Sequence, residues 1–466
     1  MSSPSDGRTA THALNGDSNG LPSVFADRQN AGQIVETLNE QLALHEPPIA
    51  PLAKSCVKLT ANTDLKKFYY KPMAMHLSGA SEVLDDRIDE FQLLIQSHHQ
   101  LEDSAFGNAA TQATNEIVAV GRIASDTPEG KLNTASLVLE TSRRTGAGLR
   151  VPLKVETISQ EFFPGQIVAV RGINASGEYF SVNEVLEAPL LPPAASLPSA
   201  LDDINDRLGV GSGDGTESAS QALNILVASG PYTADDNLAF EPLQALFEKA
   251  EIKCTNVLIL IGPLLDVEHP LLATGDFDLP DDPSIKPDKA TLIDVFRLLI
   301  GAPLTRLAQA LPSITIVMVP SVRDVVNKHV SWPQEPFARK ELGLPKQAKM
   351  VSNPVTVSLN EIVVGISAHD VLYELRREEV VVGRPKESSM LARLPRHLIQ
   401  QRHFFPLFPS VDRTLLQKTG TEEGVATGMP LDVSYLKLGE WLDVRPDMLI
   451  TPSALSPFAK VGLLFI

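Results

Sequence analysis

Hydrophobic and polar positions follow different periods in successive parts of this chain. Residues 1–60 are rich in Ser, Asn, Gly, Asp and Ala with little periodicity, which is typical of a flexible N-terminal tail. Apolar residues then recur at helical spacing, and Leu84, Ile88 and Phe91 share one helix face. We therefore expect a flexible tail over residues 1–60 and, over residues 61–112, a helical lead-in that packs on a neighbouring element.

The period falls to two in the next part of the chain, where Gly and Pro separate short apolar runs. The predicted strands are residues 117–123, 135–140, 149–153, 166–172 and 179–182. Five short strands with one longer connection, residues 154–164, predict a small Greek-key barrel, an OB-fold, over residues 113–188. The segment Phe162-Phe163-Pro164-Gly165 is predicted to be a packed corner, not a platform on which nucleic-acid bases stack.

A Pro-rich and then acidic, Gly/Ser-rich stretch over residues 189–221 predicts a linker between domains. Beyond it, apolar strands alternate with helices. The predicted strands are residues 223–228, 257–261 and 314–319, and a predicted hairpin covers residues 355–366. The predicted helices are residues 243–250, 290–311, 371–379 and 390–401. Such alternation indicates an α/β domain over residues 222–466, with any ligand site at the carboxyl ends of its strands. The expected fold class is α+β and multidomain: an OB-fold β-barrel followed by an α/β domain.

Length and composition narrow the range of functions. The chain has 466 residues, enough for two or three domains, and 40 basic against 57 acidic side chains give it a net charge of −17. Gripping nucleic acid through its phosphates requires a net basic surface, so this is not the expected main task. Two cysteines, Cys56 and Cys254, exclude a disulfide framework and a Cys-rich zinc site. Without a signal peptide or an apolar run long enough to span a bilayer, we expect a soluble intracellular protein that has no membrane partner.

The turns after three predicted strands are where chemistry is expected. They read Ser229-Gly230-Pro231-Tyr232, then Gly262-Pro263-Leu264-Leu265-Asp266, then Pro320-Ser321-Val322-Arg323-Asp324, and His369 follows the hairpin. Strands and turns in this arrangement resemble the calcineurin-like metallophosphoesterases. That family has Asp-x-His, Gly-Asp-x-x-Asp and Gly-Asn-His-Asp/Glu in the three turns, because carboxylates and imidazoles hold two divalent metals that activate a water.

Compared with that family pattern, the metal-ligand positions of this chain are degenerate, because other residue types stand at most of them. Pro263 stands where the family has a bridging Asp, and Arg323 would put a cation where a metal binds. His369 is either a relic of a later ligand or an ordinary core histidine. The resemblance therefore implies an inactive phosphoesterase-like domain with no catalytic residue, metal or cofactor. Its degenerate positions are Gly230, Pro231, Tyr232, Pro263, Asp266, Arg323, Asp324 and His369.

The same turns, in the same order, also resemble the B subunits of DNA polymerase alpha, of fungal type. Further matching segments are residues 83–91, 121–123, 131–133, 163–166, 172–174, 353–354, 401–409 and 446–450. The resemblance covers about residues 65–460. It implies a non-catalytic scaffold whose OB-fold and inactive phosphoesterase-like domain pack together and bind the zinc-bearing C-terminal domain of the polymerase catalytic subunit.

The resemblance also implies a multisubunit complex and a cellular location. The two primase subunits belong to the same complex, which makes primers at the initiation of DNA replication in the nucleus, so DNA is reached only indirectly. Tyr232, Arg323 and Asp324 are the predicted partner interface, and the alternative for Arg323 and Asp324 is a local ion pair within the degenerate site. The family usually has a small folded N-terminal domain and further strands beyond about residue 460. We therefore expect the C-terminal strands of the phosphoesterase-like domain to be missing, as in a truncated gene model or splice form.

Two other functions remain open at this point. An active metallophosphoesterase would take up metal, and an independent single-stranded-DNA-binding OB protein would bind oligonucleotides with an affinity that falls steeply with salt. Few aromatic residues accompany the cations of the barrel, which disfavours the second function. These cations are Arg143, Arg144, Arg150, Lys154 and Arg171.

Overall fold

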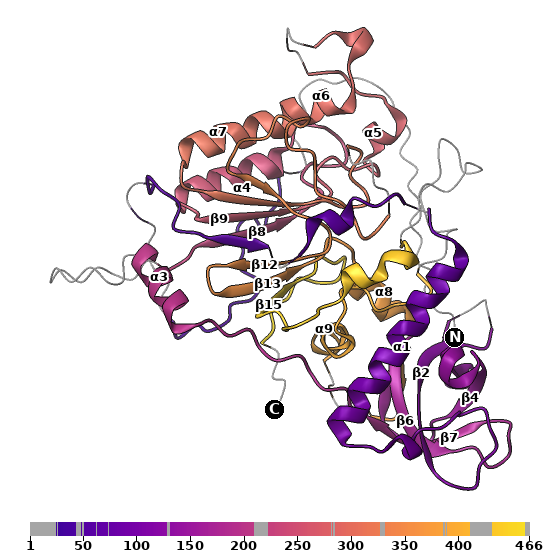
Figure 1. Ribbon diagram of the computed structural model, residues 1–466. Coiled ribbons are helices and arrows are strands. Elements are labelled where there is room, and N and C mark those ends of the chain that lie inside the picture. Colours follow the sequence, from indigo (N-terminus) through magenta and orange to yellow (C-terminus); the bar gives the residue numbers. More distant parts are fainter. Residues whose placement is uncertain are drawn as a thin grey trace. The chain divides into compact units, whose positions relative to one another are not determined.

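The computed structural model describes most of the chain (Figure 1). The described residues are 25, 27–42, 48, 51–61, 63–72, 74–127, 131–208, 222–280, 282, 285–326, 331–384, 387, 389–410 and 431–461. The chain divides into two compact units, Met1–Ile34 and Val35–Ile466. Of the first unit, residues 27–34 contain turns; everything below concerns the second. Among the described residues, no helix combines the length and apolar character needed to cross a membrane.

A closed five-stranded barrel forms where the period-two pattern predicts it. Its strands neighbour one another in the order β2-β3-β4-β7-β6. Their bounds are β2 Ile117–Ser125, β3 Leu137–Glu140, β4 Arg150–Lys154, β6 Ile167–Ile173 and β7 Phe180–Leu186, with the short helix α2, Arg143–Gly146, between β3 and β4. Alternate side chains such as Leu139, Val170 and Phe180 fill the interior, and all three are fully buried.

Helix α1, Leu77–His99, covers one side of this barrel and is the core of the predicted lead-in. Its buried residues Ile88, Phe91 and Ile95 pack with apolar side chains of β2 and β6. The face predicted from spacing is therefore confirmed, except that Leu84 contacts a different apolar cluster. The 3-10 helices η1, Leu65–Phe68, and η2, Asp103–Ala105, lie on either side of α1 in the sequence.

Two sheets stack against each other in the rest of the unit. The first is parallel, in the order β11-β10-β9-β8, and the second has the order β1-β12-β13-β15. The first contains β8 Ile225–Ser229, β9 Val257–Ile261, β10 Thr315–Val319 and β11 Ala348–Met350; the second contains β1 Leu59–Ala61, β12 Val355–Leu359, β13 Ile362–Ile366 and β15 Met448–Ile450. Their facing side chains form one apolar cluster, which explains why β9 and β10 are buried on both faces.

Helices cover the outer face of the parallel sheet and form a further layer (Figure 1). They include α4 Glu241–Ile252, α5 Pro270–Thr274, α6 Leu292–Phe296 and α7 Ala302–Ala310. A π-helical segment, Arg297–Gly301, joins α6 to α7, so the predicted helix over residues 290–311 is confirmed with one irregular turn.

A separate apolar cluster holds α8, Val371–Glu378, and α9, Met390–Gln401. The 3-10 helices η3, Pro287–Lys289, and η6, Val433–Gly439, also belong to this part.

Several sequence-based expectations need correction. The expected tail over residues 1–60 ends in a strand, because β1 pairs antiparallel with β12. The expected linker over residues 189–221 contains helix α3, Pro198–Leu208, while its Gly/Ser-rich part, Gly209–Ser220, lies outside the described residues. The long connection of the barrel includes β5, Gln160–Phe162, which pairs antiparallel with β14, Val380–Val382. A strand pairing of this kind, distant in sequence, links the barrel to the α/β part.

The corner after β5 is packed as predicted. Phe162 and Phe163 have no exposed surface, and Gly165 has a φ of +93°. A Cβ at Gly165 would overlap the backbone of Phe408, so only glycine allows the two segments to approach this closely. The corner therefore belongs to the contact between the barrel and the segment that follows α9.

Candidate functional site at the ends of the parallel strands

The three turns predicted to carry chemistry meet at one edge of the parallel sheet. Gly230, Pro231 and Tyr232 follow β8, Pro263 and Asp266 follow β9, and Arg323 and Asp324 follow β10. Since neighbouring strands β8, β9 and β10 are parallel and in register, their carboxyl ends lie side by side. The structure thus brings seven of the eight predicted positions together.

Tyr232 ties the first turn to the neighbouring strand. Its side chain is 3% exposed, and its hydroxyl accepts a hydrogen bond from the Ile261 N–H at 3.1 Å. The same hydroxyl lies 2.8 Å from the carbonyl oxygen of Ala228 and 3.0 Å from that of Ile261, to one of which it donates. Burial raises the pKa of Tyr232 well above its usual range, so the phenol stays protonated. Tyr232 acts here as a structural bridge between β8 and β9.

Asp324 organises the second and third turns through backbone donors. Its Oδ1 accepts from the N–H groups of Leu264 (2.5 Å) and Leu265 (3.1 Å), and its Oδ2 accepts from the Ser321 N–H (2.8 Å). Burial raises the pKa of Asp324 to about 7, against these three hydrogen bonds, which favour the carboxylate. Both carboxylate oxygens are therefore already used by the protein.

The turns approach each other closely at two glycines. A Cβ added at Gly230 would overlap the Pro263 carbonyl oxygen, and one added at Gly262 would overlap Oδ2 of Asp324. The Gly230–Pro231 and Gly262–Pro263 peptide bonds are both cis. Side chains larger than that of glycine at positions 230 and 262 would therefore collide with the Pro263 backbone and the Asp324 carboxylate.

Asp266, the other carboxylate among the predicted positions, is paired with Arg323. Asp266 is 5% exposed. The Nε of Arg323 donates to Oδ1 of Asp266 at 3.0 Å, and the Nη2 of Arg323 donates to its Oδ2. Arg323 also pairs with Glu268 at 2.8 Å. Burial raises the pKa of Glu268, and the nearby Arg323 opposes that shift. A guanidinium therefore holds two carboxylates at the edge of the site.

His369, the eighth predicted position, contacts residues outside the three turns. It follows β13, its Nε2 lies 2.9 Å from Oε1 of Glu374, and its ring packs edge-on against Phe405. Burial disfavours the charged imidazole, but the charge and hydrogen bond of Glu374 outweigh this and raise the pKa of His369. The imidazole is thus held by a local ion pair at the start of α8.

The donor set does not suit a binuclear metal site. Within the described ranges, no three His, Cys, Asp or Glu side chains gather closely enough to hold a metal ion. Asp266 is neutralised by Arg323, and both oxygens of Asp324 accept backbone hydrogen bonds. Of the three residues predicted to contact a partner, Tyr232 and Asp324 are buried, whereas the Arg323 side chain is 38% exposed.

Each predicted cation of the barrel is already engaged. Arg143 pairs with Asp85, Arg144 with Asp86 and Asp89, Arg150 with Glu140, and Arg171 with Glu184. The ammonium of Lys154 lies 3.4 Å from the centre of the Tyr179 ring. The positive charge that phosphates would require is therefore largely balanced within the chain.

Sequence reasoning missed a polar cluster at the contact between the barrel and α9. Glu379 accepts two hydrogen bonds from Arg393, both at 2.8 Å, and one from His397 at 2.8 Å. Gln401 clamps β6, since its Oε1 accepts from the Ile167 N–H and its Nε2 donates to the Ile167 carbonyl oxygen, each at 2.9 Å. These residues are far apart in sequence, and the one available signal was the polar side chains on the apolar face of α9.

Comparison with known proteins extends over nearly the whole described chain. Residues 81–188 match the family model for the OB domain of DNA polymerase alpha B subunits, and residues 225–460 match the model for the B subunits of DNA polymerases alpha and epsilon. The first match covers most of α1 and the barrel, and the second covers the two sheets apart from β1, with their helices.

Individual relatives, all named as B subunits of DNA polymerase alpha, agree with these matches. The chain is 35% identical over 435 residues to the relative from Schizosaccharomyces pombe, covering 92% of this chain and 70% of the relative. It is 36% identical over 467 residues to the relative from Saccharomyces cerevisiae, and 28% identical over 451 residues to that from Bos taurus. It spans 64% and 65% of the lengths of those two relatives. The chain therefore belongs to the family of DNA polymerase alpha B subunits.

Proposed function

We propose that this chain is a non-catalytic scaffold within a nuclear DNA polymerase alpha–primase complex. In this proposal it binds the zinc-bearing C-terminal domain of the catalytic subunit, joins the primase subunits through the complex and reaches DNA only indirectly. Its two-sheet part is an inactive phosphoesterase-like domain, and the chain needs no cofactor. The names of its relatives, all B subunits of DNA polymerase alpha, support membership of such a complex.

One observation carries the non-catalytic part of the proposal: the carboxylates of the strand-end turns are already engaged by the protein. Catalysis by two metals requires free carboxylate and imidazole ligands around an open position. Here both oxygens of Asp324 accept from backbone N–H groups, and Asp266 is paired with Arg323. The Gly230 turn also packs directly on the Pro263 turn, where a Cβ at Gly230 would overlap the Pro263 carbonyl oxygen.

Metal content tests this part directly. After incubation with Mn²⁺ and desalting, the purified chain should contain about zero equivalents of metal by mass spectrometry and should not hydrolyse a phosphodiester. A binuclear phosphoesterase treated in parallel shows that the procedure retains bound metal. Two equivalents of Mn²⁺ together with phosphodiesterase activity would overturn the proposal.

Partner binding is tested by co-expression with the C-terminal domain of the same organism's polymerase alpha catalytic subunit. One copy of each chain should form a stable complex that elutes as a single peak in size-exclusion chromatography. Co-expression without any co-elution would count against the scaffold function.

The predicted interface is tested separately, with Arg323→Glu. Arg323 is partly exposed at the site edge, and its carbonyl oxygen accepts from the N–H of Val267, which is 38% exposed. Reversing a charge at an interface should weaken the complex at least about tenfold. Arg297→Glu is the matched control, because Arg297 is also a half-exposed arginine in an ion pair, with Asp294. Equal binding by wild type and R323E would remove Arg323 from the interface without removing the scaffold function.

Single-strand binding by the barrel alone is a weaker candidate. The ion pairs of Arg143, Arg144, Arg150 and Arg171 balance the charge that a phosphate backbone would need. Fluorescence anisotropy with a labelled oligonucleotide should give no saturable binding at roughly physiological salt. Tight binding that weakens steeply with added salt would favour this candidate instead.

A further inference from the structure

Positive charge gathers in one short stretch of this acidic chain. Residues 47–81 contain five lysines and a single acidic residue, Asp64, whereas the whole chain has a net charge of −17. Three of these lysines, Lys66, Lys67 and Lys71, fall within six residues at the 3-10 helix η1. They belong to the indigo segment that leads into α1 (Figure 1). A local patch of opposite sign attracts negatively charged partners that the rest of the surface repels.

The backbone of this stretch is anchored by alternate residues. Phe68 is 1% exposed. Tyr70 stacks on Tyr435, with ring centres 3.6 Å apart, and its hydroxyl donates to the Pro333 carbonyl oxygen at 2.5 Å. Burial raises the pKa of Tyr70, so the phenol keeps the proton that it donates. The neighbouring side chains are therefore presented from a fixed backbone.

The side chains on either side of these anchors are exposed. All three lysines are exposed. In the part of the chain that the structure describes, none of them forms an ion pair, whereas Lys437 and Lys460 do. Tyr69, which lies between Lys67 and Lys71 in the sequence, is 62% exposed. An aromatic ring and three ammonium groups thus face solvent within six residues.

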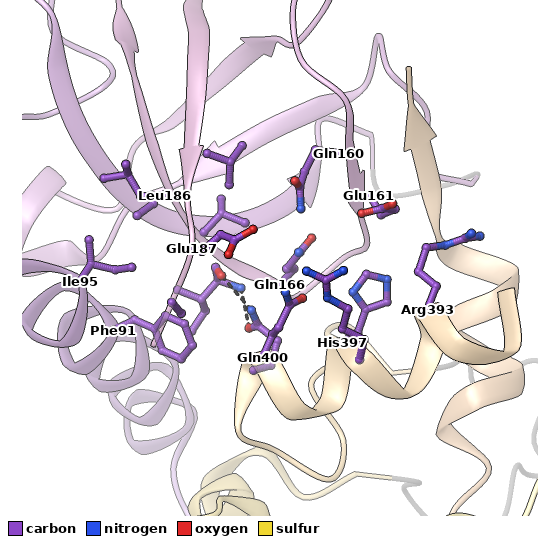
Figure 2. A pocket seen from close by; sticks show the side chains of 17 residues that line it. Phe91, Ile95, Gln160, Glu161, Gln166, Leu186, Glu187, Arg393, His397 and Gln400 are labelled. Carbon is purple, nitrogen blue, oxygen red and sulfur yellow. Dashed lines mark hydrogen bonds between the residues drawn. The ribbon is translucent and has the colours of Figure 1, made fainter. Parts of the chain in front are cut away.

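Arginines at the sites described above are neutralised by neighbouring carboxylates. Arg393 on α9, shown in Figure 2, donates two hydrogen bonds to Glu379, both at 2.8 Å. Arg323 is paired with Asp266, and the arginines of the barrel are paired with acidic side chains. Exposed positive charge without a partner therefore distinguishes the stretch around η1 from those sites.

Exposed apolar side chains adjoin the three lysines. Met75 is 51% exposed, and Leu77, the first residue of α1, is 89% exposed. Together with Tyr69, they place three large apolar or aromatic side chains on the surface within nine residues. Single exposed apolar residues are normal, whereas a group of them beside charged side chains marks an interaction surface.

Charge and composition select a peptide as the occupant. Three ammonium groups match a few carboxylates, and Tyr69, Met75 and Leu77 can pack on apolar side chains of the same ligand. A nucleic acid is a weaker match, because its continuous phosphate charge would meet the net charge of −17 on the whole chain. A short acidic peptide carries enough charge to pair with the lysines, while screening by salt limits its repulsion from more distant acidic groups.

We propose that the η1 surface binds an acidic peptide segment of a partner protein. This surface consists of Lys66, Lys67, Tyr69, Lys71, Met75 and Leu77. Its lysines pair with Asp or Glu side chains of the peptide, and its apolar and aromatic side chains contact the apolar residues of the peptide. Exposed ion pairs are individually weak, so the apolar contacts supply affinity, and the lysines supply selectivity and fast association. This inference goes beyond the proposed scaffold function and does not depend on it.

Peptide display on the purified full chain tests the proposal. Short random peptides selected on the wild type should be enriched in Asp and Glu and should contain large apolar residues. Fluorescence anisotropy with a labelled selected peptide should show affinity at least about tenfold lower for the triple variant Lys66→Glu, Lys67→Glu, Lys71→Glu, because three charges are reversed. Tyr69→Ser should also weaken binding, through loss of apolar contact. All four side chains are exposed, so urea unfolding should be nearly unchanged.

A second triple variant controls for net charge. Lys286→Glu, Lys289→Glu and Lys340→Glu reverse three exposed lysines that have acidic neighbours in the sequence, and they should change the affinity by less than about twofold. Selected peptides without acidic residues, equal binding by the wild type and the η1 triple variant, or a selection that enriches no peptide would overturn the proposal. A labelled single-stranded oligonucleotide that binds the wild type more tightly than the selected peptides, and is lost in the η1 triple variant, would overturn it in favour of nucleic acid.

Discussion

The clamp between Gln401 and Ile167 allows a sharp prediction about what joins the barrel to α9. Gln401 is 4% exposed, and its amide satisfies both backbone groups of Ile167. Gln401→Met keeps the length and helix propensity of the side chain but removes both hydrogen bonds. The buried N–H and C=O of Ile167 then lose their partner, at about 1–3 kcal/mol each. The variant should therefore lose about 2–6 kcal/mol, a large part of the roughly 5–15 kcal/mol that stabilises a domain.

Hydrogen exchange measures this loss of stability at the backbone amide of Ile167 itself. Peptides that contain Ile167 should lose protection by a factor of roughly 30 or more, which corresponds to about 2 kcal/mol, and urea unfolding should begin at lower concentration. Gln400→Met is the matched control, since it makes the same chemical change at the neighbouring position and should cost less than about 1 kcal/mol. Equal stability of Q401M and wild type, or an equal cost of Q400M, would refute the reasoning.

Three further predictions follow from the site and the corner. Arg323→Met leaves Asp266 buried without its cation, so the free energy of unfolding in urea should fall by about 1–3 kcal/mol. This loss is smaller than for a fully buried ion pair because Arg323 is partly exposed. Adding Asp266→Asn should recover part of the lost stability, and a double variant whose losses simply add would contradict the pairing. The raised pKa of His369 means that its pair with Glu374 stabilises fully below pH 6.5 and loses this effect as pH rises through the folded pKa. Unfolding free energies of wild type and His369→Gln should therefore converge between about pH 6 and about pH 9, whereas a constant difference would disprove the role of the charge. Gly165→Ala should prevent soluble expression or lower the melting temperature strongly, because its Cβ would overlap Phe408. Gly177→Ala is its control, with φ +85° and its nearest atom 3.8 Å away, and should cost about 1–2 kcal/mol; equal effects would contradict the steric argument.

Much of the architecture could be predicted because local periodicity reports it. Alternation at period two marked all five strands of the barrel, and continuous apolar runs marked β9 and β10, which are buried on both faces. The turns at Gly230, Gly262 and Arg323 could be placed at one sheet edge, because parallel strands bring their carboxyl ends together. The chemistry of residues in those turns stays a prediction, since their placement says only that seven of the eight positions lie together.

Short strands that pair across long sequence distances could not be predicted. β1, β5, β11, β14 and β15 have three residues each, which is too few for a period to appear. Their strand character depends on partners elsewhere in the chain, as in the pairing of Glu161 on β5 with Val381 on β14. The helix α3 within the expected linker was missed because the surrounding Pro-rich and Gly/Ser-rich sequence dominated the composition.

By itself, the sequence determined the longer helices and strands, the order of the barrel and the α/β part, and the family resemblance. The tertiary structure alone decided where the polar side chains find partners. Asp324 binds the backbone of a turn 60 residues away, Arg323 neutralises Asp266, and Gln401 holds Ile167 from a distance of 234 residues. The physical reason is that periodicity reports which face of an element is buried, whereas hydrogen bonds and ion pairs depend on distances of about 3 Å that only the folded chain defines.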